Sequence, residues 1–214
     1  MNEAGLAYLT WFYETNVWKN LHYRGVRTLK LPLDMWNYQE IIFENNIHWV
    51  VETGTCHGGS ALFFADLLAA GAREGGVVTV DVTHKALHPL ASAHPRISLL
   101  LGDSSTPETV NMIRRLIPPN RSRALLLILD SDHAASHVLR ELHALVPLLR
   151  RGDYLIVEDT IVNGHPVRPD FGPGPLEAVD EYLRQNPNRL IHDSAREGKF
   201  GCTVALRGYY GVGA

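Results

Sequence analysis

The chain has 214 residues, of which 45% are hydrophobic and 20% charged, and its formal net charge is −3. This composition fits one globular domain, and it excludes both a disordered chain and the basic excess of a dedicated nucleic-acid binder. No apolar stretch reaches the roughly twenty residues of a membrane span. The first residues show no signal peptide, and two cysteines, Cys56 and Cys202, suit a reducing compartment. We therefore expect a cytoplasmic protein without nucleic-acid or membrane partners.

Residues 1–45 are an aromatic-rich extension that contains three of the four tryptophans, Trp11, Trp18 and Trp36. Pro32 favours an extended conformation for the residue before it, and Asp34 is expected to cap a helix over residues 34–45. The aromatic content exceeds what one small core needs. We therefore predict that this helical extension covers the ligand site of the following domain and contributes a homodimer contact.

From residue 47 onward, short apolar runs alternate with amphipathic stretches. Residues 124–129 are an unbroken apolar run, which is typical of a central strand covered on both faces. Pro147 is expected to end the preceding helix early. The alternation predicts an α/β fold, a mostly parallel seven-stranded sheet with helices on both faces. The expected strands cover residues 48–52, 76–82, 96–101, 124–129, 154–157, 190–193 and 200–206, and the expected helices cover 60–71, 107–117, 138–149 and 175–184.

Open α/β sheets bind ligands at the carboxyl ends of their strands. The first strand is followed by the glycine-rich turn 52–60, whose glycines would let the backbone approach a ligand closely. Cys56 stands where the dinucleotide fingerprint requires its second glycine, which disfavours a nicotinamide cofactor. Glu52 would repel a pyrophosphate and suits a ligand with an ammonium group. By itself, the turn fits a purely structural loop equally well.

The next two strand ends are also polar. Asp81 suits the two hydroxyls of a ribose, and Gly102-Asp103-Ser104 could flank an adenine. Each of them alone could be a solvated strand end. Together with the glycine turn they predict a nucleoside ligand without phosphates, for which S-adenosylmethionine (SAM) is the obvious candidate. The predicted cofactor-binding residues are Glu52, Gly54, Thr55, Gly58, Ser60, Asp81, Asp103, Ser104 and Asp130.

Carboxylates gather at the fourth and fifth strand ends. Asp130 follows residues 124–129, and Glu158 and Asp159 follow residues 154–157. If these strands are neighbours, about 4.8 Å apart, the three carboxylates converge. They would repel one another without a cation, and neither segment contains Lys or Arg. An all-oxygen set suits Mg²⁺ first and Mn²⁺ second. Asp132 is expected to act only as a helix N-cap.

His133 opens the helix that follows Asp130. A helix N-terminus would lower the pKa of this imidazole and keep it neutral, so that it could accept a proton. The loop 161–175, seven of whose residues are Pro or Gly, overhangs the predicted metal site. Asn163, His165 and Arg168 could contact a substrate there, and the alternative is a solvated connector.

Five segments resemble the cephalosporin hydroxylase / rhamnosyl O-methyltransferase family over about residues 18–207: 30–34 (KLPLD), 52–60 (ETGTCHGGS), 129–133 (LDSDH), 157–160 (VEDT) and 163–167 (NGHPV). The resemblance implies a Rossmann-like class I methyltransferase domain over residues 46–214 that uses SAM and Mg²⁺ on a sugar hydroxyl. It implies Asp130, Glu158 and Asp159 as metal ligands and His133 as the base. The short chain and the Asn-Gly-His-Pro loop are similar to small actinobacterial sugar methyltransferases, including enzymes that methylate mannosides in polysaccharide synthesis.

The expected reaction is the transfer of a methyl group to a rhamnosyl- or mannosyl-type hydroxyl, with Mg²⁺ lowering the pKa of that hydroxyl and His133 removing its proton. One alternative is a metal-dependent hydroxylase, although non-haem iron oxygenases use two histidines and one carboxylate. The others are a nicotinamide-dependent oxidoreductase and a non-enzymatic nucleoside-binding domain. The sequence does not specify which sugar or which hydroxyl is the acceptor.

Overall fold

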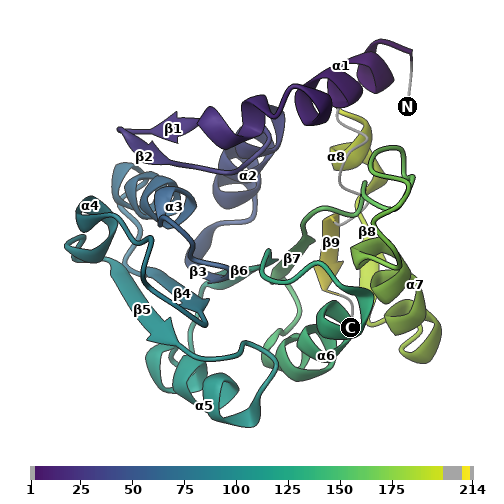
Figure 1. Cartoon of the computed structure of the whole chain (residues 1–214). Helices are drawn as coiled ribbons and strands as arrows, with labels where there is room; N and C mark the ends of the chain where they lie inside the picture. The colour runs from purple at the N-terminus through teal and green to yellow at the C-terminus, as the bar shows by residue number, and fades with distance from the viewer. Residues whose placement is uncertain (1–2, 200–208, 213–214) are drawn as a thin grey trace.

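The computed structural model describes residues 3–199 and 209–212, and its centre is a seven-stranded sheet (Figure 1). The strand order is β5-β4-β3-β6-β7-β9-β8, and only β9 runs antiparallel to its neighbours. The predicted mostly parallel sheet is therefore confirmed. The expected strand at 200–206 lies outside the described residues. The strands are β3 (Ile47–Thr53), β4 (Val77–Asp81), β5 (Ile97–Leu101), β6 (Ala124–Leu129), β7 (Tyr154–Val157), β8 (Leu190–His192) and β9 (Tyr209–Val212).

Two layers of helices cover the sheet. α1 (Glu3–Glu14), α2 (Pro32–Glu44) and α3 (Gly59–Ala70) pack on one face, and α5 (Pro107–Leu116), α6 (Ala135–Leu145) and α7 (Pro175–Gln185) on the other. Leu126 belongs to the first core cluster, whereas its neighbour Leu127 belongs to the second. β6 is thus buried on both faces, as its apolar run predicts. The short elements are η1 (Val17–Asn20), β1 (His22–Tyr23), β2 (Val26–Arg27), α4 (Pro89–Ser92), η2 (Val146–Leu148) and α8 (Ser194–Gly198).

Strand order places a crevice between β3 and β6. The chain runs outward from β3 through β4 to β5, then returns to place β6 on the other side of β3. Such a reversal opens a ligand crevice at the carboxyl ends of the two strands. Thr53 pairs with Leu129, so Gly54 and Asp130 leave the sheet side by side. A Cβ on Gly54 would lie 1.9 Å from the carbonyl oxygen of Asp130, and its φ is +89°, so only glycine fits.

Two helix ends can be compared with the sequence expectations: α2 begins earlier than predicted, whereas α6 ends early as predicted. α2 begins at Pro32 rather than after a cap at Asp34, because proline needs no N–H partner in a first helical turn. Asp34 lies inside that turn and is 1% exposed. α6 ends at Leu145, and a 3-10 turn carries Pro147, which confirms the predicted early end. Asp132 does not cap α6, since Ala134 is its N-cap residue and Asp132 Oδ1 accepts the Ala134 N–H.

The N-terminal helices share a core with the sheet. Leu9 and Phe12 of α1 and Tyr38 of α2 are at most 3% exposed, and they belong to the same cluster as Val50 of β3. The sheet can therefore bury one of its faces only with this segment in place. Among the helices that the structure describes, none is long and apolar enough to cross a bilayer.

Candidate active site

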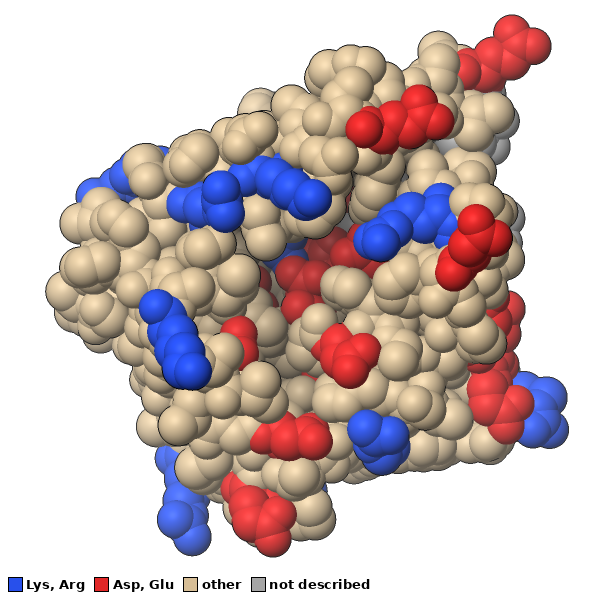
Figure 2. Space-filling model, viewed as in Figure 1, with Lys and Arg blue, Asp and Glu red and all other residues tan. Residues whose placement is uncertain are grey.

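A cavity of about 670 Å³ opens at the carboxyl ends of the parallel strands. Figure 2 shows it as a hollow near the centre of the face, with acidic side chains inside and basic side chains around it. The turns after β3 to β7 form one wall, and the N-terminal segment forms the other. Its acidic lining residues are Asp34, Asp81, Asp103, Asp130, Asp132, Glu158 and Asp159, and its basic ones are Arg27, Lys30, Arg140 and Arg168.

One half of the cavity contains most of the predicted cofactor residues. The Cys56 N–H donates to Asp81 Oδ2 over 2.8 Å, which ties the glycine turn to the end of β4. Gly58, at φ +81°, is the N-cap residue of α3, so the helix N-terminus faces the cavity. Gly54, Thr55, Gly58, Ser60, Asp81, Asp103, Ser104 and Asp130 all line this cavity.

Hydrogen bonds hold the turn after β5 in place. Asp103 Oδ1 accepts from the Ser105 hydroxyl and the Ser105 N–H, and these bonds lower the pKa of Asp103. Ser104 donates to Glu141 Oε1 over 2.5 Å, and Ser131 donates to the same oxygen over 2.7 Å. Glu141 is fully buried on α6 and was not singled out from the sequence, because on α6 it is spaced like an ordinary helix residue.

Glu52 is the one predicted cofactor residue that does not line the cavity. It is 0% exposed, its Oε2 accepts from Thr79, and burial raises its pKa. Its other oxygen lies 3.9 Å from the ammonium of Lys30. The ammonium group that Glu52 faces is therefore a lysine of the chain itself.

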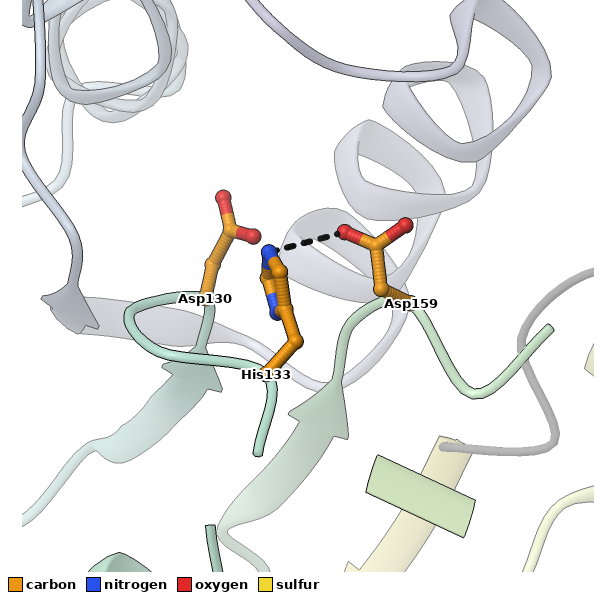
Figure 3. Close-up of side chains that lie close together, drawn as sticks. All are labelled: Asp130, His133 and Asp159. Atoms are coloured by element: carbon orange, nitrogen blue, oxygen red, sulfur yellow. Dashed lines mark ion pairs between the residues drawn. The ribbon is translucent and has the colours of Figure 1, made fainter. Parts of the chain in front are cut away.

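Asp130, His133 and Asp159 converge at the other half of the cavity (Figure 3). His133 Nε2 lies 3.3 Å from Asp159 Oδ2, and one ligand atom from each residue lies within 4.8 Å of the others. Asp130 and His133 come from the turn after β6, and Asp159 comes from the end of β7. The predicted pairing of these two strands brings them together.

Glu158, predicted as the third carboxylate of a metal site, lines the same cavity but is paired with other residues. Its Oε1 accepts from the Tyr38 hydroxyl over 2.5 Å and from Lys30 Nζ over 2.8 Å. The third member of the converging group is His133 instead. The set of three carboxylates, Asp130, Glu158 and Asp159, therefore stays a prediction, and the structure adds His133 beside two of them.

Lys30 is the residue that the sequence analysis missed. Its Nζ lies 2.5 Å from Asp130 Oδ2 as well as 2.8 Å from Glu158 Oε1, and its side chain is 3% exposed. Burial lowers its pKa, but the carboxylates of Asp130, Glu158 and Glu52 outweigh burial and raise it. For the carboxyl group of Asp130 the effects are reversed: burial raises its pKa, and the positive charge of Lys30 lowers it by a smaller amount. The local segments contain no cation because the cation comes from 100 residues upstream.

The ionisation of His133 also differs from the expectation. Burial lowers its pKa, but the nearby carboxylates, Asp159 foremost, outweigh burial and raise it. α6 begins only at Ala135, so His133 lies outside the helix. The pKa of His133 is thus raised by its carboxylate neighbours, where a lowered pKa was expected.

Tyr13 of α1 completes this end of the cavity. Its hydroxyl donates to Asp159 Oδ1 over 2.7 Å, leaving Oδ2 directed to His133. Burial and the charge of Asp159 raise the pKa of Tyr13, so it remains a donor at neutral pH. The N-terminal segment therefore contacts the converging group directly.

The three predicted substrate residues in the loop after β7 have different surroundings: two contact α7, and one lines the cavity. Asn163 Nδ2 and His165 Nε2 lie 2.8 and 2.9 Å from Glu177 Oε1, and the Gly174 N–H donates to Glu177 Oε2. They anchor the loop to α7 and do not line the cavity. Arg168 does line it, at φ +51°. Glu177 is the third residue after the N-cap Gly174, but glycine has no hydroxyl, so the Ser/Thr-x-x-Glu pattern of a capping box is absent and the sequence does not mark Glu177.

This sheet order, with a glycine turn and an acid at successive strand ends, defines a class I SAM-dependent methyltransferase. The family described as Rhamnosyl O-methyltransferase/CmcI matches residues 15–211, and the chain belongs to that family. Rhamnosyl O-methyltransferases of Mycobacterium tuberculosis and Mycobacterium leprae are each 45% identical to it over 202 residues, which is 94% of this chain and 82% and 87% of theirs. A structure of CmcI with Mg and SAM superposes with a TM-score of 0.72 at 27% identity, covering 92% of this chain and 78% of the other.

Proposed function

We propose that the protein transfers the methyl group of SAM to a hydroxyl of a sugar, in a rhamnosyl- or mannosyl-type glycoside. The observation that carries this proposal is the position of His133. Its Nε2 lies between two carboxylates in the same cavity whose other half is lined by Asp81 and Asp103. A nucleoside half next to a proton-accepting half suits methyl transfer to a hydroxyl, and the rhamnosyl O-methyltransferase relatives support a sugar as the acceptor.

Different lining residues contact different parts of the cofactor in this proposal. Asp81 offers carboxylate oxygens to the ribose hydroxyls, and the turn with Asp103 and Ser104 flanks the adenine. The backbone at Gly54, which approaches the β6 end closely, faces the amino-acid part of SAM. Because no phosphate has to be held, the acid-rich lining is compatible with this ligand.

The donors present fit a hard divalent cation. Asp130 and Asp159 each offer a carboxylate oxygen, and these oxygens lie within 4.8 Å of one another, which suits Mg²⁺ and also Mn²⁺. CmcI, a member of the same family, has been solved with Mg and SAM. A bound divalent cation supplies one effect here, which is to lower the pKa of a coordinated hydroxyl. Glu158 stays with Lys30 and Tyr38 in this arrangement.

His133 is the proton acceptor in the proposed reaction. Its Nε2 takes the hydroxyl proton, and the imidazolium that forms is stabilised by Asp159 Oδ2 at 3.3 Å. Tyr13 fixes the other oxygen of Asp159, so the carboxylate keeps its orientation while the charge on His133 changes. Holding the hydroxyl close to the methyl group in line with the sulfonium supplies much of the remaining acceleration.

The first experiment is calorimetric titration with SAM, with NAD⁺ as a parallel control. Binding of SAM alone supports the assignment, whereas binding of neither would remove its basis. Next, His133→Ala is expected to abolish nearly all turnover on sugar acceptors while SAM affinity stays unchanged. Measuring Mg²⁺ affinity of the same variant separates a base from a ligand. A large loss of Mg²⁺ affinity would make His133 a metal ligand.

A further inference from the structure

A second cavity, of about 510 Å³, adjoins the first. It lies between the N-terminal segment and the loop after β7, and its size is in the range of small-molecule sites. Tyr13, Trp18 and Arg168 line both cavities, so these three residues form their boundary. None of the residues discussed for cofactor binding lines the second cavity.

The boundary lies at the acceptor end of the first cavity. The Tyr13 hydroxyl contacts Asp159, which itself faces His133. Asp81 and Asp103, at the cofactor end, line only the first cavity. A group bound in the second cavity would therefore continue from the reacting hydroxyl, and not from the cofactor.

The position of Arg168 at this boundary is fixed by its surroundings. It is a non-glycine residue at φ +51°, a strained conformation that persists only where neighbouring contacts hold it. Those contacts are backbone hydrogen bonds on either side of it, since the Val167 N–H donates to the Ile161 carbonyl and the Phe171 N–H donates to the Arg168 carbonyl. The loop thus presents one guanidinium to both cavities.

The wall of the second cavity mixes polar and flat apolar groups. Thr10, Glu14 and Lys19 provide hydroxyl, carboxylate and ammonium groups, and Trp18, Pro166 and Pro169 provide rigid apolar surfaces. An acyl chain would require a continuous apolar wall, which these residues do not make. A sugar ring has a rim of hydroxyls and apolar C–H faces, and it matches both kinds of group.

We propose that the second cavity is a subsite for a second sugar ring, attached to the sugar that is methylated. This inference rests on the proposed function, because it takes the first cavity as the site of the acceptor hydroxyl. It makes a disaccharide or longer glycan, and not a free monosaccharide, the preferred acceptor. Trp18 and Arg168 then contact both rings, and Thr10 contacts only the second.

The test measures binding to the full chain with Mg²⁺ and S-adenosylhomocysteine, which cannot donate a methyl group. The probes are methyl α-L-rhamnoside and a methyl glycoside of α-L-rhamnosyl-(1→3)-α-L-rhamnose. Calorimetry is expected to show about tenfold tighter binding of the disaccharide, equivalent to about 1.4 kcal/mol. Saturation-transfer NMR, which needs no variant, is expected to show contact with both rings.

A matched pair of variants locates the effect. Thr10→Phe would place a ring inside the second cavity and is expected to remove the disaccharide preference while leaving monosaccharide affinity unchanged. Ala7→Phe, an exposed position on the same helix outside both cavities, should keep the preference. Equal wild-type affinity for the two probes, or saturation of one ring only, would overturn the subsite alone. Binding of neither probe by a protein that binds SAM would overturn the sugar acceptor itself and the subsite with it.

Discussion

Lys30→Met should destabilise the protein strongly when no divalent cation is present. The substitution keeps a long unbranched side chain but removes the ammonium group, which lies 2.5 Å from Asp130 and 2.8 Å from Glu158. A third carboxylate, Glu52, lies 3.9 Å away and is fully buried. Removing one partner of a buried ion pair costs about 3–5 kcal/mol, because the remaining charge is left uncompensated.

This loss is large beside the roughly 5–15 kcal/mol by which whole domains are stable. For a chain of this length, each kcal/mol lowers the melting temperature by about 2–4 °C, so the expected decrease is roughly 6–20 °C. Urea unfolding in EDTA at neutral pH measures the free energy directly. Lys85→Met, at an exposed lysine, is the matched control and should stay within about 0.5 kcal/mol of the wild type.

Added Mg²⁺ should recover part of the loss in Lys30→Met, because the ion would pair with Asp130, one of the carboxylates that Lys30 neutralises. The reasoning would be contradicted if the free energy of unfolding of Lys30→Met in EDTA lay within about 1 kcal/mol of the wild-type value. It would mean that the three carboxylates are already neutral or solvated in the folded protein. Lys30 would then have no role in holding them together.

Three further predictions concern the loop, the glycine turn and the surface. Burial raises the pKa of Glu177, but hydrogen bonds from His165, Asn163 and the Gly174 N–H outweigh it and lower the pKa from 4.5 to about 2. Because the folded-state pKa of Glu177 is depressed, its carboxylate stabilises the folded protein above pH 4.5, and this stabilisation is lost as the pH falls towards 2. The urea midpoint of Glu177→Gln should therefore decline less over this pH range than that of the wild type. Parallel declines would refute the assignment. Gly54→Ala should lose SAM binding by calorimetry and at least about 1–3 kcal/mol of stability, since its Cβ would meet Asp130 at φ +89°; unchanged SAM affinity would show that the turn is not at the cofactor. Finally, light scattering should give twice the chain mass of 23.9 kDa, because Leu6, Trp11, Trp36 and Phe43 are 45–57% exposed on α1 and α2; a mass equal to one chain would exclude the dimer.

The sequence by itself determined six strands of the sheet, the glycine turn and most of the cavity; β9 (Tyr209–Val212) was not predicted. The periods of apolar residues and the placement of Gly and Pro are local, so they defined β6 and β7 to the residue and most other elements to within a few residues. The strand-end rule then put Asp81, Asp103, Asp130 and Asp159 at one edge without knowledge of any contact.

Only the tertiary structure decided how the charges at that edge are paired. Lys30 reaches Asp130 and Glu158 across 100 and 128 residues, and no local pattern encodes such a distance along the chain. The same holds for Glu177, which draws Asn163 and His165 away from the cavity. Residue type and spacing fix which element a side chain belongs to, whereas its partner depends on which other elements pack within hydrogen-bonding distance of it.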